Sequence, residues 1–260
     1  MENWTLITGA SEGLGAEFAR IAAAEGRNLI LTARSKDKLT ALAEDLHGIA
    51  GEIRVLPADL GDLSQVESLW QEASRDCHID ILVNNAGLAG HGTFGSGKGW
   101  PRDLSTIGVN MTALTYLMKM AIPHMQAQGG GRILNVASTA GFMPGPNLSV
   151  YHATKAYVLS LTEAVAEELR GSNTSVTALC PGATETAFFD AADMRGVGLL
   201  KLGRPASAES VARVGWQAMK KGRRIRVTGA MNKMFAAAPR FAPRAVTTFI
   251  AGKFMSKGRG

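Results

Sequence analysis

The chain has 260 residues and a net charge of +6, a length that suits one α/β domain with a sizeable core. Its two cysteines, Cys77 and Cys180, lie far apart and lack metal-ligand spacing, so we expect neither a disulfide framework nor a metal site. The N-terminus has no basic region and no apolar stretch of membrane-spanning length, so we expect a cytoplasmic protein without a signal peptide or a membrane span.

Short apolar runs alternate with stretches of helical spacing. The predicted strands are Leu6–Thr8, Asn28–Thr32, Ile53–Pro57, Ile81–Asn84, Arg132–Ala137, Ser175–Cys180 and Arg224–Val227. The predicted helices cover residues 14–25, 36–49, 64–74, 101–127, 151–171 and 207–221. Such alternation is typical of parallel strands joined by right-handed crossovers. The sequence therefore predicts a doubly wound parallel sheet of about seven strands, with helices on both faces because the strands are apolar throughout.

A glycine-rich loop, Thr8 to Gly15, follows the first predicted strand and leads into a helix. Glycines here permit a tight turn and close approach of the backbone to a pyrophosphate, and the amides of the helix N-terminus face the anion. A glycine run alone fits an ordinary tight turn equally well, but a strand-loop-helix position favours a dinucleotide site. The predicted contacts are Gly9, Ser11, Glu12, Gly13, Leu14 and Gly15.

The end of the second predicted strand indicates which dinucleotide binds. NAD-binding proteins usually place an acidic side chain there for the ribose 2′-hydroxyl. This chain has Arg34 instead, whose guanidinium suits a 2′-phosphate, with Lys36 and Lys38 close behind. The pattern favours NADP(H) over NAD(H). Arg34 also fits an ordinary solvated position, and Glu12 is an acidic neighbour that weakens the preference.

Polar residues also follow the third and fourth predicted strands, at the edge where ligands collect in such sheets. Asp59 and Leu60 follow the third strand, and Asp59 is suited to accept from the adenine amino group. Asn85, Ala86 and Gly87 follow the fourth strand and are expected to line the ribose and nicotinamide side of the cleft. For Asp59, a plain polar turn is nearly as good an interpretation.

Tyr151 and Lys155 are four residues apart on a predicted helix, which places them on one face about one turn apart. A phenol is a poor base at neutral pH, but a nearby ammonium is expected to lower its pKa. Ser138 ends a strand ahead of this pair and is placed to hydrogen-bond a substrate oxygen. Asn110 lies within the long helical stretch, where it is expected to bend the helix or hold a water beside Lys155.

Together these motifs resemble the short-chain dehydrogenase/reductase family over roughly residues 4 to 230, with the correct order and spacing. The motifs are the loop at 8–15, Asn84 to Gly87, Asn110, Ser138, Tyr151, Lys155, and Pro181-Gly182 through Thr186. The resemblance implies a Rossmann-type fold and an NAD(P)(H)-dependent oxidoreductase acting on a small-molecule carbonyl or alcohol. It also implies a homodimer or homotetramer.

The resemblance further implies a role for each matching residue. Asn110, Ser138, Tyr151 and Lys155 would form a catalytic tetrad in which Tyr151 protonates the carbonyl oxygen as hydride reaches the carbon. Ser138 would position that oxygen, Lys155 would hold the cofactor ribose, and Asn110 would link a proton relay to solvent. The expected contacts around the nicotinamide and diphosphate are Pro181, Gly182, Thr184 and Thr186. A non-catalytic redox sensor or regulatory partner is the alternative, against which the intact tetrad argues.

The segments 142–148 and 188–194 flank the expected substrate cleft and are mostly apolar, with Arg195 as a candidate for an acidic group. They favour an apolar ketone or a 3-oxoacyl-type substrate. His152 adjoins Tyr151, but adjacent helical positions point about 100° apart, so we expect it to face elsewhere.

Net positive charge is confined to the C-terminal end. Residues 1–200 contain 14 Lys and Arg against 21 Asp and Glu, whereas residues 201–260 contain 14 against 1. Apolar residues alternate with cations such as Lys233, Arg240 and Lys257 in an amphipathic extension over 231–260, beyond a single domain over 1–230. We expect the extension to pack on its own cleft or on a neighbouring subunit, with peripheral contact to an anionic membrane as the less favoured alternative. Its aromatic residues are expected to be buried, which argues against nucleic acid.

Overall fold

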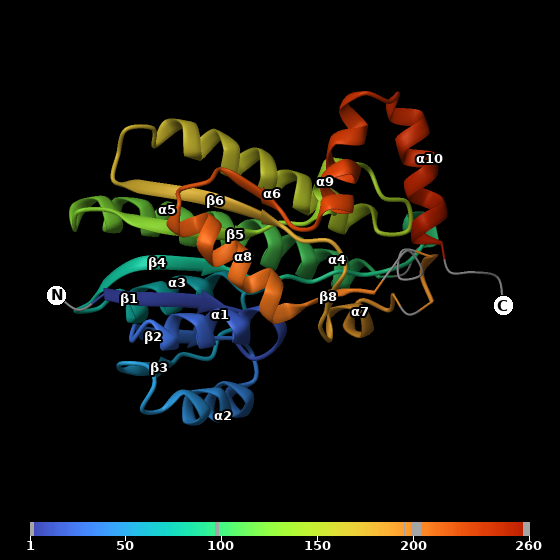
Figure 1. The fold of residues 1–260 in the computed structure, drawn as a ribbon. Coiled ribbons are helices and arrows are strands. Elements are labelled where there is room, and N and C mark those ends of the chain that lie inside the picture. Colours follow the sequence, from blue (N-terminus) through green and yellow to red (C-terminus); the bar gives the residue numbers. More distant parts are fainter. Residues whose placement is uncertain (1–2, 97–98, 195, 199–203, 257–260) are drawn as a thin grey trace.

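The computed structural model describes residues 3–96, 99–194, 196–198 and 204–256, so Arg195 and Lys257 lie outside the described residues. Seven parallel strands form one sheet in the order β3-β2-β1-β4-β5-β6-β9 (Figure 1). They are β1 (Asn3–Thr8), β2 (Asn28–Thr32), β3 (Ile53–Val55), β4 (His78–Asn84), β5 (Gly131–Val136), β6 (Thr174–Cys180) and β9 (Ile225–Val227). This confirms the predicted doubly wound sheet. The strand order reverses between β1 and β4, and ligands bind at such a switch point.

Helices cover both faces of the sheet, and the strands bury side chains toward both. The helices α1 (Gly13–Ala24), α2 (Lys36–Leu46) and α8 (Ala208–Lys220) pack on one face, against residues such as Ile7 and Leu134. The helices α3 (Leu63–Ala73), α5 (Leu114–Ala127) and α6 (Ser149–Glu168) pack on the other, against residues such as Leu6 and Ile133. Two apolar cores therefore fix the strands, and the polar loops follow at the C-terminal ends of the strands.

The predicted helix over 101–127 is interrupted. It consists of α4 (Trp100–Ile107), a π-helical turn (Gly108–Ala113) and α5. The wider turn contains Asn110, whose side chain bonds to neighbouring elements instead of following the regular helix surface. π-Helical turns of this kind occur frequently at functional sites, and sequence spacing alone does not reveal them.

Several short elements lie between β6 and α8 and were not predicted, because segments of two to four residues carry no periodicity. The strands β7 (Thr184–Glu185) and β8 (Ala206–Ser207) form a small parallel pair. The helix α7 (Phe188–Ala191) lies between them in sequence. Short 3₁₀ turns also occur over Phe94–Ser96 and Thr139–Phe142.

The chain ends in two helices, α9 (Ala230–Ala237) and α10 (Arg244–Met255), joined through a 3₁₀ turn over Ala238–Arg240. We call residues 230–255 the C-terminal hairpin. It rises at one end of the sheet beside the long loops (Figure 1). The Met255 side chain is buried in a small apolar cluster with Leu148 and Met194. Of the helices described, none is both long and apolar enough to cross a bilayer.

Candidate active site

A cavity of about 810 Å³ lies at the C-terminal ends of the central strands and extends beneath the C-terminal hairpin. It brings together most of the residues predicted for the site. Those that line it are Gly9, Ser11, Glu12, Gly13, Leu14, Arg34, Asp59, Leu60, Asn85, Ala86, Gly87, Ser138, Tyr151, Lys155, Pro181, Gly182, Thr184 and Thr186. Gly15 and Asn110 do not line the cavity, but they contact residues that do, Gly9 and Leu88 respectively.

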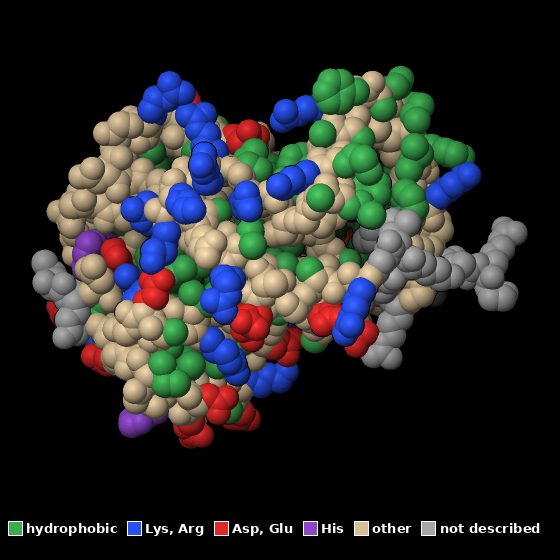
Figure 2. Space-filling model, in the orientation of Figure 1, with side chains coloured by type: hydrophobic (Ala, Val, Ile, Leu, Met, Phe, Trp, Pro, Cys, Tyr) green, Lys and Arg blue, Asp and Glu red, His purple; other side chains and the backbone are tan. Residues whose placement is uncertain are grey.

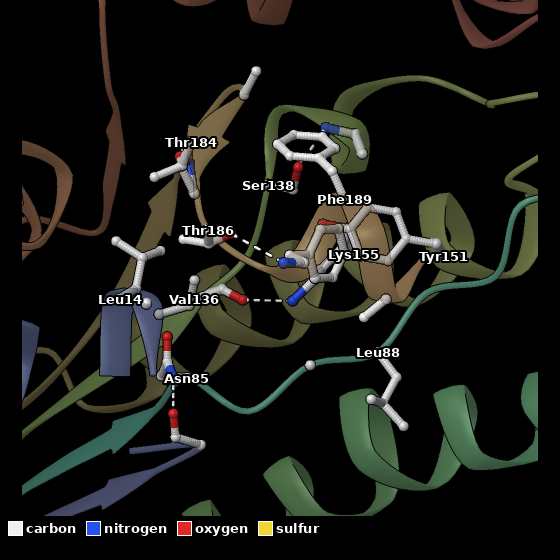
Figure 3. Close-up of a pocket in the computed structure, with 18 of the residues that line it drawn as sticks. Leu14, Asn85, Leu88, Val136, Ser138, Tyr151, Lys155, Thr184, Thr186 and Phe189 are labelled. Atoms are coloured by element: carbon white, nitrogen blue, oxygen red, sulfur yellow. Dashed lines mark hydrogen bonds between the residues drawn. The ribbon is translucent and has the colours of Figure 1, made fainter. Parts of the chain in front are cut away.

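The glycine loop is held closely against the loop that follows β4. Gly9 has a φ of +63°, a conformation that favours glycine. A Cβ on Gly15 would lie 2.1 Å from the Gly9 carbonyl oxygen, so only glycine fits there. The Asn85 side-chain amide donates to the carbonyl oxygens of Thr8 (2.9 Å) and Gly9 (3.1 Å), and Figure 3 draws one of these two bonds. Asn85 therefore fastens the two loops together, and its contact with a cofactor stays a prediction.

The loop after β2 presents a cation to the cavity. Arg34 is exposed, lines the cavity and forms no ion pair within the described part of the chain. Glu12, the acidic neighbour, is paired instead with Lys38 at 2.6 Å. The negative charge that weakened the case for a 2′-phosphate is thus balanced by a lysine.

Three further predicted contacts use their side chains in local turns. The Asp59 carboxylate accepts from the backbone N–H of Gly61 at 2.9 Å. The Thr184 hydroxyl donates to the Gly182 carbonyl oxygen at 3.1 Å, and the Thr186 hydroxyl accepts from the Phe188 N–H at 3.4 Å. These bonds shape the cavity wall, and contacts of these side chains with a ligand stay predictions.

Asn110 connects three segments behind Tyr151 and Lys155. Its side-chain oxygen accepts from the Leu88 N–H at 2.8 Å, and its amide donates to the Leu88 carbonyl oxygen at 2.9 Å. The same amide donates to the Thr154 hydroxyl of α6 at 2.9 Å. The side chain is buried. Asn110 thereby fixes the loop after β4 against the helix that carries Tyr151 and Lys155.

Ser138 and Tyr151 approach each other across the cavity (Figure 3). Ser138 starts the 3₁₀ turn after β5, where its hydroxyl accepts from the Ala140 N–H at 3.1 Å. Burial raises the pKa of Tyr151 to about 12, and a hydrogen bond with Ser138 opposes part of that rise. The phenol is therefore protonated and able to donate to an oxygen near Ser138.

The Lys155 ammonium does not lower the pKa of Tyr151, which corrects the sequence-based expectation. Its Nζ donates to the Val136 carbonyl oxygen at 2.7 Å and lies 5.7 Å from the centre of the Tyr151 ring (Figure 3). Burial lowers the pKa of Lys155 itself to about 8. Desolvation dominates both groups because they share a poorly hydrated corner of the cavity.

His152 lines the same cavity as Tyr151, contrary to the expectation that it faces elsewhere. Its ring lies 6.2 Å from the Tyr151 ring, and its Nδ1 donates to the Met143 carbonyl oxygen at 2.8 Å. Burial lowers the pKa of His152, so the ring is neutral near neutral pH. It supports the segment between Ser138 and Tyr151.

The cavity wall beyond Tyr151 is apolar. Phe188 packs 5.4 Å from the Tyr151 ring, and Met143, Leu148, Phe189 and Met194 also line the wall, as predicted for both flanking segments. The sequence did not assign the hairpin residues that line the cavity, which are Met231, Asn232, Phe235, Ala251, Phe254 and Met255. It also did not assign Val136 as the partner of Lys155 or Thr154 as a partner of Asn110. The expectation that the extension over 231–260 packs on its own cleft agrees with this lining, although the sequence did not indicate which of its residues face the cavity.

Comparison with known proteins identifies the family of the chain. The family model for short chain dehydrogenases matches residues 3–195. The ketoacyl reductase HetN of Nostoc sp. is 35% identical over 68% of this chain and 62% of its own length. The 3-oxoacyl-[acyl-carrier-protein] reductase FabG of Thermotoga maritima is 32% identical over 80% of this chain and 87% of its own.

Solved structures support the same relationship across nearly the whole chain. A short-chain dehydrogenase from Sphingobium yanoikuyae in complex with NADPH superposes with a TM-score of 0.80 at 30% identity. The superposition covers 94% of this chain and 98% of that one. With its parallel sheet, glycine loop and Ser-Tyr-Lys cavity, the chain belongs to the short-chain dehydrogenase/reductase family of oxidoreductases.

Proposed function

We propose that the protein is an NADP(H)-preferring oxidoreductase that transfers hydride between the nicotinamide and an apolar ketone or 3-oxoacyl-type substrate, or the corresponding alcohol. The observation that carries the proposal is the single cavity that contains the glycine loop at one end and Ser138, Tyr151 and Lys155 at the other. Two observations support the fit to a dinucleotide. The glycine loop is packed so closely that a Cβ on Gly15 would collide with the Gly9 carbonyl oxygen, and the Arg34 guanidinium lines the cavity with no ion pair among the described residues. When bound, the cofactor supplies or accepts the hydride.

In this proposal Tyr151 acts as the acid in carbonyl reduction. Its raised pKa keeps the proton on the phenol until a substrate oxygen accepts it. Ser138 orients that oxygen through its hydroxyl. Lys155 holds the ribose hydroxyls, and Asn110 positions the loop and helix on either side, as its bonds to Leu88 and Thr154 allow.

The substrate class is proposed from the lining of the cavity beyond Tyr151. Aromatic and aliphatic side chains form that wall, including Phe188, Phe189, Phe235 and Phe254. An apolar wall with few polar groups binds an acyl chain or a bulky ketone better than a sugar or a small acid. Both curated relatives named above are ketoacyl reductases, which agrees with a 3-oxoacyl-type substrate.

The test is a panel of 3-oxoacyl thioesters and apolar ketones assayed with NADPH and with NADH. Tyr151→Phe is expected to lower kcat by about 100- to 10,000-fold, the usual contribution of a general acid, while NADPH binding persists. Tyr157→Phe is the matched control, because Tyr157 lies on the same helix outside the cavity and bonds to Thr115. Full activity of Tyr151→Phe refutes the assignment. Cofactor binding without turnover of any carbonyl would favour a redox sensor.

The cofactor preference is tested at Arg34. Arg34→Asp is expected to lower kcat/KM with NADPH by about tenfold or more, since a charge-assisted bond to the 2′-phosphate is lost, and to improve use of NADH. Lys36→Asp makes the same charge change next to the cavity without lining it. An equal effect of both variants would indicate a general charge effect and contradict a specific contact.

We also propose a cytoplasmic homodimer or homotetramer. The α4 helix exposes Trp100 and Leu104, apolar surface of the kind that subunits bury between them. Both cysteines are free and buried, as suits a reducing compartment. Light scattering of the purified chain should give a mass of two or four subunits, and a monomer at micromolar concentration would refute the assembly.

A further inference from the structure

The outer surface of the C-terminal hairpin is unusually apolar for a surface. The described part of the chain exposes eleven large hydrophobic side chains, and six of them belong to the hairpin: Met231, Met234, Phe241, Val246, Phe249 and Ile250. Phe241, in the connection between α9 and α10, is 88% exposed, and Phe249 is 65% exposed, so the expectation that the aromatic residues of this extension are buried is wrong for these two. Figure 2 shows the corresponding hydrophobic atoms gathered at the end of the molecule that holds the hairpin. Contiguous apolar surface of this kind marks an interaction site.

The same surface carries only positive charge. Lys233, Arg240, Arg244 and Lys253 are exposed on the hairpin, and the described residues give none of them an ion-pair partner. The last acidic residue of the chain is Glu209, so residues 210–260 contain no carboxylate side chain. Apolar side chains interspersed with unpaired cations are the composition of a helix that lies in the interface of an anionic membrane.

The inner surface of the hairpin lines the catalytic cavity. The rings of Phe235 in α9 and Phe254 in α10 meet edge to face with their centres 6.5 Å apart, and both line that cavity. A second, open groove of about 620 Å³ runs along α10 beside Pro146, with Arg244 and Lys253 on its wall. The same hairpin therefore forms an apolar, basic outer surface on one side and part of the apolar cavity wall on the other.

A second copy of this chain is a poor occupant of that surface. In a symmetric dimer each patch meets its own equivalent, so the hairpin cations would face one another without any acidic partner on the hairpin. An anionic lipid surface instead offers phosphates to the cations and acyl chains to the phenylalanines. The charge complementarity thus favours lipid.

We propose that the outer surface of the C-terminal hairpin docks peripherally on anionic phospholipid bilayers, with Phe241 and Phe249 inserted among the acyl chains and Arg240 and Arg244 on the headgroup phosphates. Docked in this way, the hairpin places the apolar wall of the cavity next to the source of an apolar substrate. Binding to vesicles does not require catalysis, so the experiment below tests the docking proposal independently of the proposed function.

The test is co-sedimentation of the full chain with phosphatidylglycerol/phosphatidylcholine vesicles and with pure phosphatidylcholine vesicles. We expect binding to the anionic vesicles only, weakening as salt is raised. Each cation at the surface contributes about fivefold in affinity, so Arg240→Glu/Arg244→Glu should weaken binding by at least about 25-fold. Phe241→Ser/Phe249→Ser should also release the protein, and both pairs are exposed, so the fold should survive, as circular dichroism would verify.

The control is Lys221→Glu/Arg223→Glu, which makes the same charge change at exposed positions outside the hairpin. It should retain at least half of the wild-type binding. Equal loss in the control would show attraction by net charge alone and overturn the proposal. So would absence of wild-type binding to anionic vesicles, or a fall in oligomer mass in the hairpin variants, which would assign the surface to subunit contact.

Discussion

The Lys155 ammonium donates to the Val136 carbonyl oxygen at 2.7 Å, which ties helix α6 to the end of strand β5. The side chain is only 4% exposed, and no carboxylate is described beside it. A positive charge is therefore held in a poorly hydrated site by a single carbonyl dipole. Burying a charge in this way lowers the free energy of unfolding, and proteins retain such destabilising groups where their function requires them.

The first prediction concerns the stability that the protein loses by burying the Lys155 ammonium. The pKa of Lys155 is about 8 in the folded state, below the usual 10.5 of a lysine, so the unfolded chain binds more protons between these values and wild-type stability rises with pH there. Lys155→Met should therefore be more stable than wild type near neutral pH, by up to about 3 kcal/mol. The advantage should vanish by about pH 10.5.

Denaturant unfolding at several pH values measures this difference. Lys119→Met, at an exposed position on α5, is the matched control and should change stability little at any pH. A Lys155→Met variant that is less stable than wild type at neutral pH would show that the bond to Val136 outweighs the desolvation of the ammonium.

The second prediction concerns the phenol. Because burial raises the pKa of Tyr151 to about 12, the cofactor-free protein should show no phenolate from this residue at about pH 10.5, where an ordinary tyrosine is largely ionised. The measurement is the phenolate absorbance of wild type minus that of Tyr151→Phe, in which Tyr116 and Tyr157 cancel. A difference titration with its midpoint at or below about pH 10 would contradict the prediction.

The third prediction concerns Asn110 as a positioning residue. Asn110→Ala leaves the Leu88 N–H and carbonyl without their partner, so the free energy of unfolding should fall by about 1–3 kcal/mol. Because α6 loses its connection to the loop after β4, kcat should fall more than KM rises. Met111→Leu, in the same π-helical turn, is the control. A rise in KM with unchanged kcat would assign Asn110 to substrate binding instead.

The sequence predicted the parts of this protein that depend on local pattern. Apolar runs and helical spacing sufficed for the sheet, and the glycine loop and the Tyr151–Lys155 spacing located the cavity because strand ends collect at one edge of a parallel sheet. The division at residue 230 stays a prediction, although α9 begins at Ala230.

The remaining features depend on contacts between segments far apart in the chain. The π-helical turn contains Asn110, which bonds to Leu88 and Thr154, and Lys155 points to the carbonyl oxygen of Val136, which accepts its hydrogen bond. The pKa of Tyr151 depends on burial, which neighbouring residues in the sequence do not determine.

The fourth prediction tests the cradle of the glycine loop. A Cβ at Gly15 would meet the Gly9 carbonyl oxygen at 2.1 Å, and this backbone atom cannot yield without shifting the loop that Asn85 fastens. Gly15→Ala should therefore lower the free energy of unfolding by about 1–3 kcal/mol. NADPH affinity, measured by fluorescence, should fall by more than the affinity for an apolar ketone, because the displaced backbone belongs to the phosphate end of the cavity.

Gly95→Ala is the matched control, since nothing lies within 4 Å of a Cβ at that position and its φ is not positive. It should leave both stability and NADPH binding nearly unchanged. If Gly15→Ala bound NADPH as tightly as wild type, the glycine loop would not be the phosphate site, and the cofactor would have to lie elsewhere in the cavity.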